Sequence, residues 1–185
     1  MSAATMEDPT KDPPPGTTQA ASEDTAGQDE RGGKVAAFRR RAMPPLRLSL
    51  ITLGVADLKR AIAFYEALGL ERKVKAAEGV AFFAMGDVAL ALYPRHELAA
   101  DAGMVAGRAG QFGGITLACN RASRAEVDAT LIRLVAAGGR ALRPAHPTSW
   151  GGYIGYVADP DGHPWEVAHD PGFPLDAEGR ITLPE

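Results

Sequence analysis

The order of apolar segments repeats once along this chain, in residues 46–94 and again in residues 113–169. The first segment, 47–55, is rich in leucine and β-branched residues, which predicts a strand. Asp57 then provides an N-cap, apolar residues follow at helical spacing, and Gly69 ends the predicted helix. This internal repeat restricts the fold more than any other feature of the sequence.

Short strands complete the first half. Two apolar runs, 80–85 and 88–94, are joined by Gly86 and Asp87 and predict a hairpin. A further short strand over 71–75 gives this half the order β-α-β-β-β.

The second half has the same order. Residues 113–120 predict a strand, and Ser123 with Glu126 forms a capping box at the start of a helix. Gly138 and Gly139 end that helix. The closing hairpin is predicted at 153–158 and 163–169, around the turn Asp159-Pro160-Asp161-Gly162.

Neither half can close a sheet by itself, so each must bury its apolar side against further structure. We therefore predict an α+β fold of paired β-α-β-β-β modules, residues 46–94 and 113–169. The modules are expected to form a curved mixed sheet with the helices on its outer face. Its concave face is then free to hold a small molecule.

The composition excludes several other classes of protein. The chain has 185 residues, 45% of them hydrophobic, and its formal net charge of −3 gives no sign of a nucleic-acid surface. Cys119 is the single cysteine, which excludes an intramolecular disulfide and a cysteine-built metal cluster and fits a reducing cytoplasm. No apolar run is long enough to cross a membrane.

The two ends of the chain differ from the repeat. Residues 1–45 are rich in Pro, Gly, Ser, Thr, Asp and Glu, which predicts a disordered N-terminal tail. Met43 is an alternative start, in which case the preceding residues come from an over-extended gene model. The folded domain is predicted over 46–171, and residues 172–185 are predicted to be a C-terminal tail.

The closing strand carries a carboxylate between apolar residues. Glu166 alternates with Trp165 and Val167, so its side chain points to the opposite face of the strand. A carboxylate there meets solvent, a hydrogen-bond partner or a ligand. Two alternatives remain for Glu166. It forms a structural hydrogen bond to Thr52, Thr116 or a backbone amide, or it contacts a ligand.

Four stretches resemble, in the right order, the vicinal oxygen chelate superfamily of glyoxalases, bleomycin-resistance proteins, fosfomycin-resistance enzymes and extradiol dioxygenases. They are TLGVADLKRAIAFYEALGL (52–70), FFAMGDVALALYPR (82–95), GGITLA (113–118) and GGYIGYVADPDGHPWEVAHDP (151–171). The resemblance spans roughly residues 46–171. It implies the paired-module fold with a ligand site on the concave face.

The resemblance also implies a metal site, of which this sequence keeps one position. Metal-dependent members place one ligand on each of four strands, and Glu166 matches the fourth. Leu50, Ala91 and Gly114 stand at the other three positions. A single carboxylate does not retain a divalent metal, so no cofactor is expected.

Histidine could rebuild a metal site only from other positions. His163 and His169 have the opposite strand parity to Glu166 and should point away from it. His146 lies in a predicted Pro-rich loop from which it could reach the concave face, and His96 lies in the linker between the halves.

Strand parity and the loops at the mouth of the concave face define the candidate site. Trp150, flanked by glycines, either stacks on a planar ligand or caps the core, and Tyr93 is either a ligand contact or a core ring. Glu166 is the candidate catalytic residue. The predicted substrate-binding residues are Leu50, Thr52, Ala91, Tyr93, Gly114, Thr116, Trp150 and Tyr153.

The resemblance implies two functions of different class. In the first, the protein is a metal-free binder of a small apolar or cationic molecule. In the second, it is a glyoxalase- or dioxygenase-type enzyme with a rebuilt metal site or with Glu166 as general acid and base, because burial raises the pKa of a carboxyl group. Members of the superfamily commonly pair, which makes a homodimer an expected partner.

Overall fold

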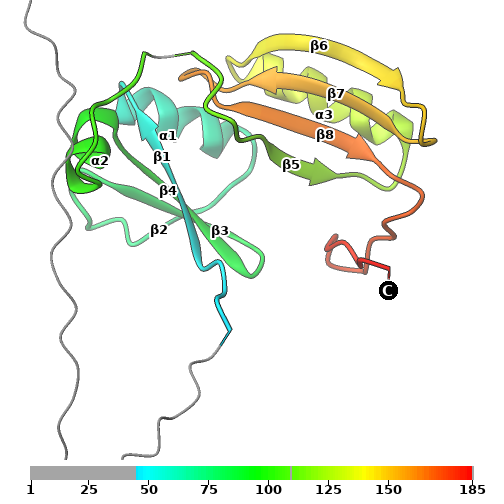
Figure 1. Ribbon diagram of the computed structural model, residues 1–185, viewed down its shortest axis with the longest axis horizontal. Coiled ribbons are helices and arrows are strands. Elements are labelled where there is room, and N and C mark those ends of the chain that lie inside the picture. Colours follow the sequence, from blue (N-terminus) through cyan, green and yellow to red (C-terminus); the bar gives the residue numbers. More distant parts are fainter. Residues whose placement is uncertain (1–44, 109, 185) are drawn as a thin grey trace, which may run out of the picture. The chain divides into compact units, whose positions relative to one another are not determined.

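The computed structural model describes residues 45–108 and 110–184, which fold as a repeat of two modules (Figure 1). The predicted disorder of the N-terminal tail concerns residues that lie outside this range. Within the described residues, no helix is long and apolar enough to cross a membrane. The first module consists of β1 (Leu50–Val55), α1 (Leu58–Ala67), β2 (Arg72–Lys73), β3 (Ala81–Met85) and β4 (Val88–Pro94).

The second module repeats this order after a short connecting helix, α2 (Arg95–Asp101). Both long helices begin as predicted: the side chain of Asp57 accepts from the amide of Arg60 at 3.1 Å, and that of Ser123 from the amide of Glu126 at 3.2 Å. The second module consists of β5 (Leu117–Asn120), α3 (Arg124–Ala136), β6 (Arg140–Pro147), β7 (Tyr153–Ala158) and β8 (Pro164–His169).

The strands form two mixed four-stranded sheets, in the orders β1-β4-β3-β2 and β5-β8-β7-β6. The first strand of each module pairs in parallel with the last, and the other pairs are antiparallel. The α+β class and the paired modules are therefore confirmed. The eight strands are divided between two sheets that are not closed, whereas the sequence suggested one curved sheet.

Some elements differ from the sequence prediction. Strand β5 begins at Leu117 and not near residue 113, and β2 holds only two residues. Helix α2 was not predicted, and strand β6 was implied by the repeated order but given no residue range. Strand β6 is mostly exposed and contains two prolines, so it lacks the alternation of apolar and polar residues that marks a half-buried strand.

The helix-covered faces of both sheets share one hydrophobic core. Tyr65 of α1 is fully buried in it, and its ring lies 6.2 Å from the ring of Trp165 in β8. The Trp165 indole donates to the Tyr65 hydroxyl at 3.3 Å, and that hydroxyl donates to the Asp159 carboxylate at 2.8 Å. A residue of the first module is therefore hydrogen-bonded to two residues of the second.

The closing turn adds a second tie between the modules. The carboxylate of Asp161, with a side chain 1% exposed, accepts from the backbone amide of Ala56 at 2.8 Å and from the Arg60 guanidinium at 2.9 Å. Arg95 donates to the carbonyls of Gly54 and Asp161. The turn was predicted to set the hairpin only, but it also holds the end of β1 and the start of α1.

Asp159 is ionised in this buried turn. Burial alone raises the pKa of its carboxyl group, but hydrogen bonds from the His163 imidazole, the His163 amide and the Tyr65 hydroxyl outweigh it and lower the pKa. Its native pKa is below the unfolded value, so this carboxylate contributes stability above the unfolded pKa. That contribution is lost as the pH falls through the native pKa.

We expect Tyr65→Phe to lower the free energy of unfolding by about 1–3 kcal/mol, because it removes one donor from the buried Asp159 carboxylate and leaves the Trp165 indole without its partner. Urea unfolding at neutral pH measures this change. Tyr153→Phe is the matched control, since its hydroxyl makes one exposed hydrogen bond, to Asp128. It should cost less than about 0.5 kcal/mol. Equal losses in the two variants would contradict the role assigned to Tyr65.

Candidate functional site

Glu166 lies on the face of its sheet that is opposite the helices, and we refer to this face of each sheet as the open face. Its register partners are Ala118 in β5 and Tyr156 in β7, so the three side chains form a row across the sheet. The Tyr156 hydroxyl donates to Oε2 of Glu166 at 2.5 Å. The carboxylate therefore has a protein partner, but not one of those proposed from the sequence.

The second carboxylate oxygen of Glu166 is not used by this pair. No side chain or amide of the described residues is hydrogen-bonded to Oε1 of Glu166. Burial raises the pKa of Tyr156 to about 12, and the hydrogen bond and charge of Glu166 add to the effect. The phenol thus stays protonated at neutral pH and orients a carboxylate whose free oxygen can accept a proton or a hydrogen bond from a ligand.

The open face of the other sheet is built from small and apolar side chains. Thr52 of β1 and Ala91 of β4 are register partners, and Phe82 of β3 continues their row. Leu50 keeps 41% of its surface exposed at the start of β1. Tyr93 shares this face and is half-buried. These positions agree with the parity prediction, and their contact with a ligand stays a prediction.

Four of the predicted site residues lie elsewhere. Gly114 and Thr116 precede β5 and are exposed, so strand parity does not apply to them. Tyr153 faces α3, where its hydroxyl donates to Asp128 at 3.0 Å, and so points away from the open face. Trp150 is 54% exposed and its ring packs on Gly152, so it does not cap the core.

Tyr156 is the candidate-site residue that the sequence prediction missed. The closing hairpin pairs Ala158 with Pro164, and the same register pairs Tyr156 with Glu166. Counting outward from the turn would have brought the two side chains together on one face. The turn was recognised in the sequence, so the signal was present.

The His, Cys, Asp and Glu side chains of the described residues form no group that fits a metal ion. Within residues 45–108 and 110–184, no three His, Cys, Asp or Glu side chains converge in a way that could hold one. Two histidines have other partners: His163 pairs with Asp159, and Nδ1 of His169 lies 3.1 Å from the Arg121 carbonyl. His146 was predicted in a loop, but it lies in β6, with Nδ1 3.1 Å from the Pro144 carbonyl.

Comparison with known proteins places these features in context. The family model described as "Glyoxalase/Bleomycin resistance protein/Dioxygenase superfamily" matches residues 47–167. No curated protein shows a significant match. Among solved structures, a glyoxalase-related enzyme from Fulvimarina pelagi is 39% identical, with a TM-score of 0.66, and the match covers 74% of this chain and 97% of that chain.

Two further structures extend the comparison. Lactoylglutathione lyase from Agrobacterium tumefaciens is 31% identical, with a TM-score of 0.53, over 68% of this chain and 95% of that chain. A glyoxalase/bleomycin resistance protein/dioxygenase family enzyme from Burkholderia phytofirmans PsJN is 17% identical, with a TM-score of 0.58, over 67% of this chain and 98% of that chain. At that identity the last match concerns the fold alone.

A double-mutant cycle with Glu166→Ala and Tyr156→Phe tests the open-face pair. We expect a coupling free energy of about 1.5–3 kcal/mol, because the hydrogen bond joins a neutral donor to a charged acceptor and is partly shielded from water. Urea unfolding of the four proteins gives the coupling. A value near zero would mean that Tyr156 does not orient the carboxylate.

Proposed function

Because the chain belongs to the glyoxalase/bleomycin resistance protein/dioxygenase superfamily, we propose that it binds a small organic molecule on its open faces. One observation carries the proposal: Glu166 presents a free carboxylate oxygen, held in place by Tyr156, on a face with small neighbours. Thr52 and Ala91 are register partners on the open face of the other sheet, and an apolar surface with few polar groups is typical of ligand sites.

The chemistry of this face favours a ligand that carries a positive charge or a hydrogen-bond donor. Glu166 can only accept, and its phenol partner is already committed to it. The Glu166 side chain is half-buried, and its partial removal from water strengthens an interaction with a cation. The apolar part of the ligand would lie along Leu50, because Ala91 is only 1% exposed.

We further propose that this binding needs no resident metal. The lack of three converging donor side chains among the described residues supports this reading. So do the apolar residues Leu50 and Ala91 on the two strands where the superfamily implies ligands.

A second candidate function rests on a different observation. The similarity to a lactoylglutathione lyase at 31% identity favours an enzyme that uses Glu166 for proton transfer. In such an enzyme, Tyr156 would keep the carboxylate in position while its free oxygen takes up and returns a proton. The two candidates share the same residues and differ in whether a reaction follows binding.

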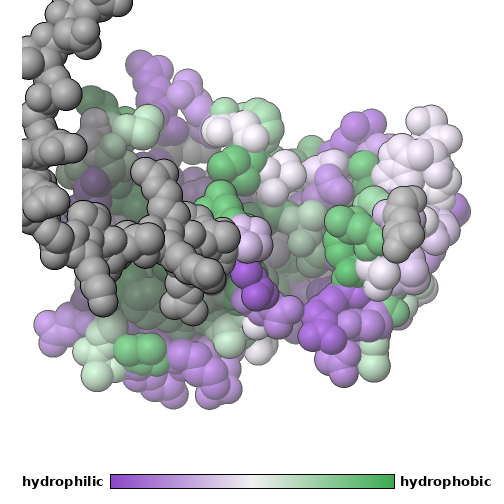
Figure 2. All heavy atoms as spheres, turned by 60° about the horizontal axis from the view of Figure 1, so that its bottom comes forward, coloured by the Kyte–Doolittle hydropathy of each residue, from purple (hydrophilic) through white to green (hydrophobic). Residues whose placement is uncertain are grey.

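A second copy of the chain is the protein partner that we propose. Leu48 and Leu50, at the entry to β1, keep 65% and 41% of their surface exposed. Figure 2 shows further hydrophobic atoms at the molecular surface. Pairing of two chains would remove such surface from water. A cytoplasmic location stays a prediction from the single cysteine.

A thermal-shift screen of small amines and uncharged apolar compounds tests the binding proposal. We expect Glu166→Gln to weaken cationic ligands by about 1.5–3 kcal/mol, roughly ten- to a hundredfold, and to leave uncharged ligands unaffected. Glu66→Gln, at an exposed position on α1, is the matched control for the loss of one negative charge. A role for Glu166 would be contradicted if the variant bound both ligand classes equally more weakly, or if it bound both classes as the parent protein does.

Elemental analysis and an activity assay separate the two candidate functions. Purified protein should carry well below one equivalent of zinc, nickel, iron or manganese, and a chelator should leave its melting temperature unchanged. Turnover of the methylglyoxal–glutathione adduct that is lost in Glu166→Gln would favour the enzyme. A stoichiometric metal with a chelator-sensitive melting transition would refute the metal-free proposal.

Sedimentation equilibrium tests the homodimer. The chain has a mass of 19.4 kDa, and we expect a species of twice that mass. Replacement of the exposed apolar pair, in Leu48→Lys/Leu50→Lys, should shift the equilibrium toward the monomer, because each charge would have to be buried in the contact. A monomer at all concentrations in the parent protein would exclude this proposal.

A further inference from the structure

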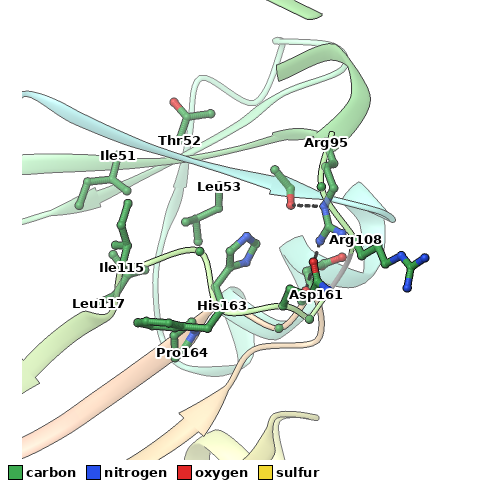
Figure 3. A pocket seen from close by; sticks show the side chains of 17 residues that line it. Ile51, Thr52, Leu53, Arg95, Arg108, Ile115, Leu117, Asp161, His163 and Pro164 are labelled. Atoms are coloured by element: carbon green, nitrogen blue, oxygen red, sulfur yellow. Dashed lines mark hydrogen bonds between the residues drawn. The ribbon is translucent and has the colours of Figure 1, made fainter. Parts of the chain in front are cut away.

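A cavity of about 420 Å³ lies between the edge of β1, the segment before β5 and the closing turn (Figure 3). It does not include Glu166 or Tyr156. Its apolar wall is formed by Ile51, Leu53, Ile115, Leu117, Phe112 and Pro164, and its polar end by Arg95, Arg108, Asp161 and His163.

His163 contributes a fixed imidazole to the polar end. Its Nδ1 lies 2.9 Å from Oδ2 of Asp159, and because a carboxylate only accepts, this nitrogen carries the proton. Asp159 is held in turn by the Tyr65 hydroxyl and by two backbone amides. Nε2 has no hydrogen-bond partner among the described residues, and the ring points into the cavity (Figure 3).

Arg95 contributes a fixed positive charge. Its guanidinium donates to the carbonyls of Gly54 at 3.4 Å and Asp161 at 3.2 Å, which orient the group without neutralising it (Figure 3). Asp161 is the carboxylate nearest to it in the lining, but Oδ1 already accepts from Arg60 and Ala56, and Oδ2 is shielded from solvent. The electrostatic balance of the cavity is therefore positive.

We propose that this cavity is a second ligand site, which takes a small organic carboxylate with an apolar body. The carboxylate would accept from the Arg95 guanidinium, and the body would lie against Ile51, Leu53 and Ile115. The volume falls within the range of small-molecule sites, and an apolar wall with a few converging polar groups is their common lining. This site is separate from the open-face site and does not depend on it.

Titration with phenylacetate, monitored by backbone amide NMR, tests the proposal. Phenylacetamide is the matched neutral probe of the same shape. We expect phenylacetate to shift the amides of Gly113, Ile115 and Gly162, which line the cavity, and to leave those of Ala118 and Tyr156 unchanged. Phenylacetamide should bind at least about tenfold more weakly, since it cannot form the charged contact with Arg95.

Two variants assign the binding to the cavity. Arg95→Gln should weaken the binding of phenylacetate at least about tenfold. Arg124→Gln should leave this binding unchanged, because Arg124, at the start of α3, lies over the ring of Tyr153 and does not line the cavity. Gly113→Leu adds bulk at a residue that lines the cavity and does so without strain: the backbone is not left-handed there, and an added Cβ would meet no atom within 4 Å. It should abolish binding even if Arg95→Gln proves unstable.

Three outcomes would overturn the proposal. They are no saturable shift by phenylacetate in the parent protein, equal affinity for the amide, and unchanged affinity in Gly113→Leu. Because the open-face amides are recorded in the same spectra, shifts there alone would support the open-face proposal and reject this one.

Discussion

The buried carboxylate of Asp159 is the interaction on which the arrangement of this protein depends. It accepts hydrogen bonds from the Tyr65 hydroxyl, the His163 imidazole and the backbone amides of Asp161 and His163. A charge with a side chain only 1% exposed is tolerated only when such donors replace its water. Because Tyr65 belongs to the first module, the requirement that this charge be satisfied also fixes the modules to each other.

The same turn determines what the closing strand presents. Strand β8 leaves the turn with Trp165 and Val167 in the core, so the intervening Glu166 must face the opposite side. Pairing with β7 then brings the Tyr156 hydroxyl to its carboxylate. The core contact of Trp165 with Tyr65 and the open-face pair are therefore two consequences of one strand register.

The open face and the cavity offer ligands opposite chemistry. The proposed ligand of the open face, where Glu166 has a free carboxylate oxygen, is a cation or a hydrogen-bond donor, while the proposed ligand of the cavity, where Arg95 carries a positive charge, is a carboxylate. The closing hairpin contributes residues to each site. His163 and Glu166 are three residues apart and point to opposite sides of the chain. One hairpin therefore contributes to two separate surfaces.

Local patterns in the sequence determined the elements and their order. The caps at Asp57 and Ser123, the spacing of apolar residues and the closing turn are each set by neighbours within a few residues, and they predicted the paired modules and the face on which Glu166 lies. Partners distant in sequence could not be predicted this way, because they depend on which strands and helices come together. Only the tertiary structure decided that Tyr65 reaches Asp159, that Tyr153 turns toward α3, and that Arg95 and His163 meet around one cavity.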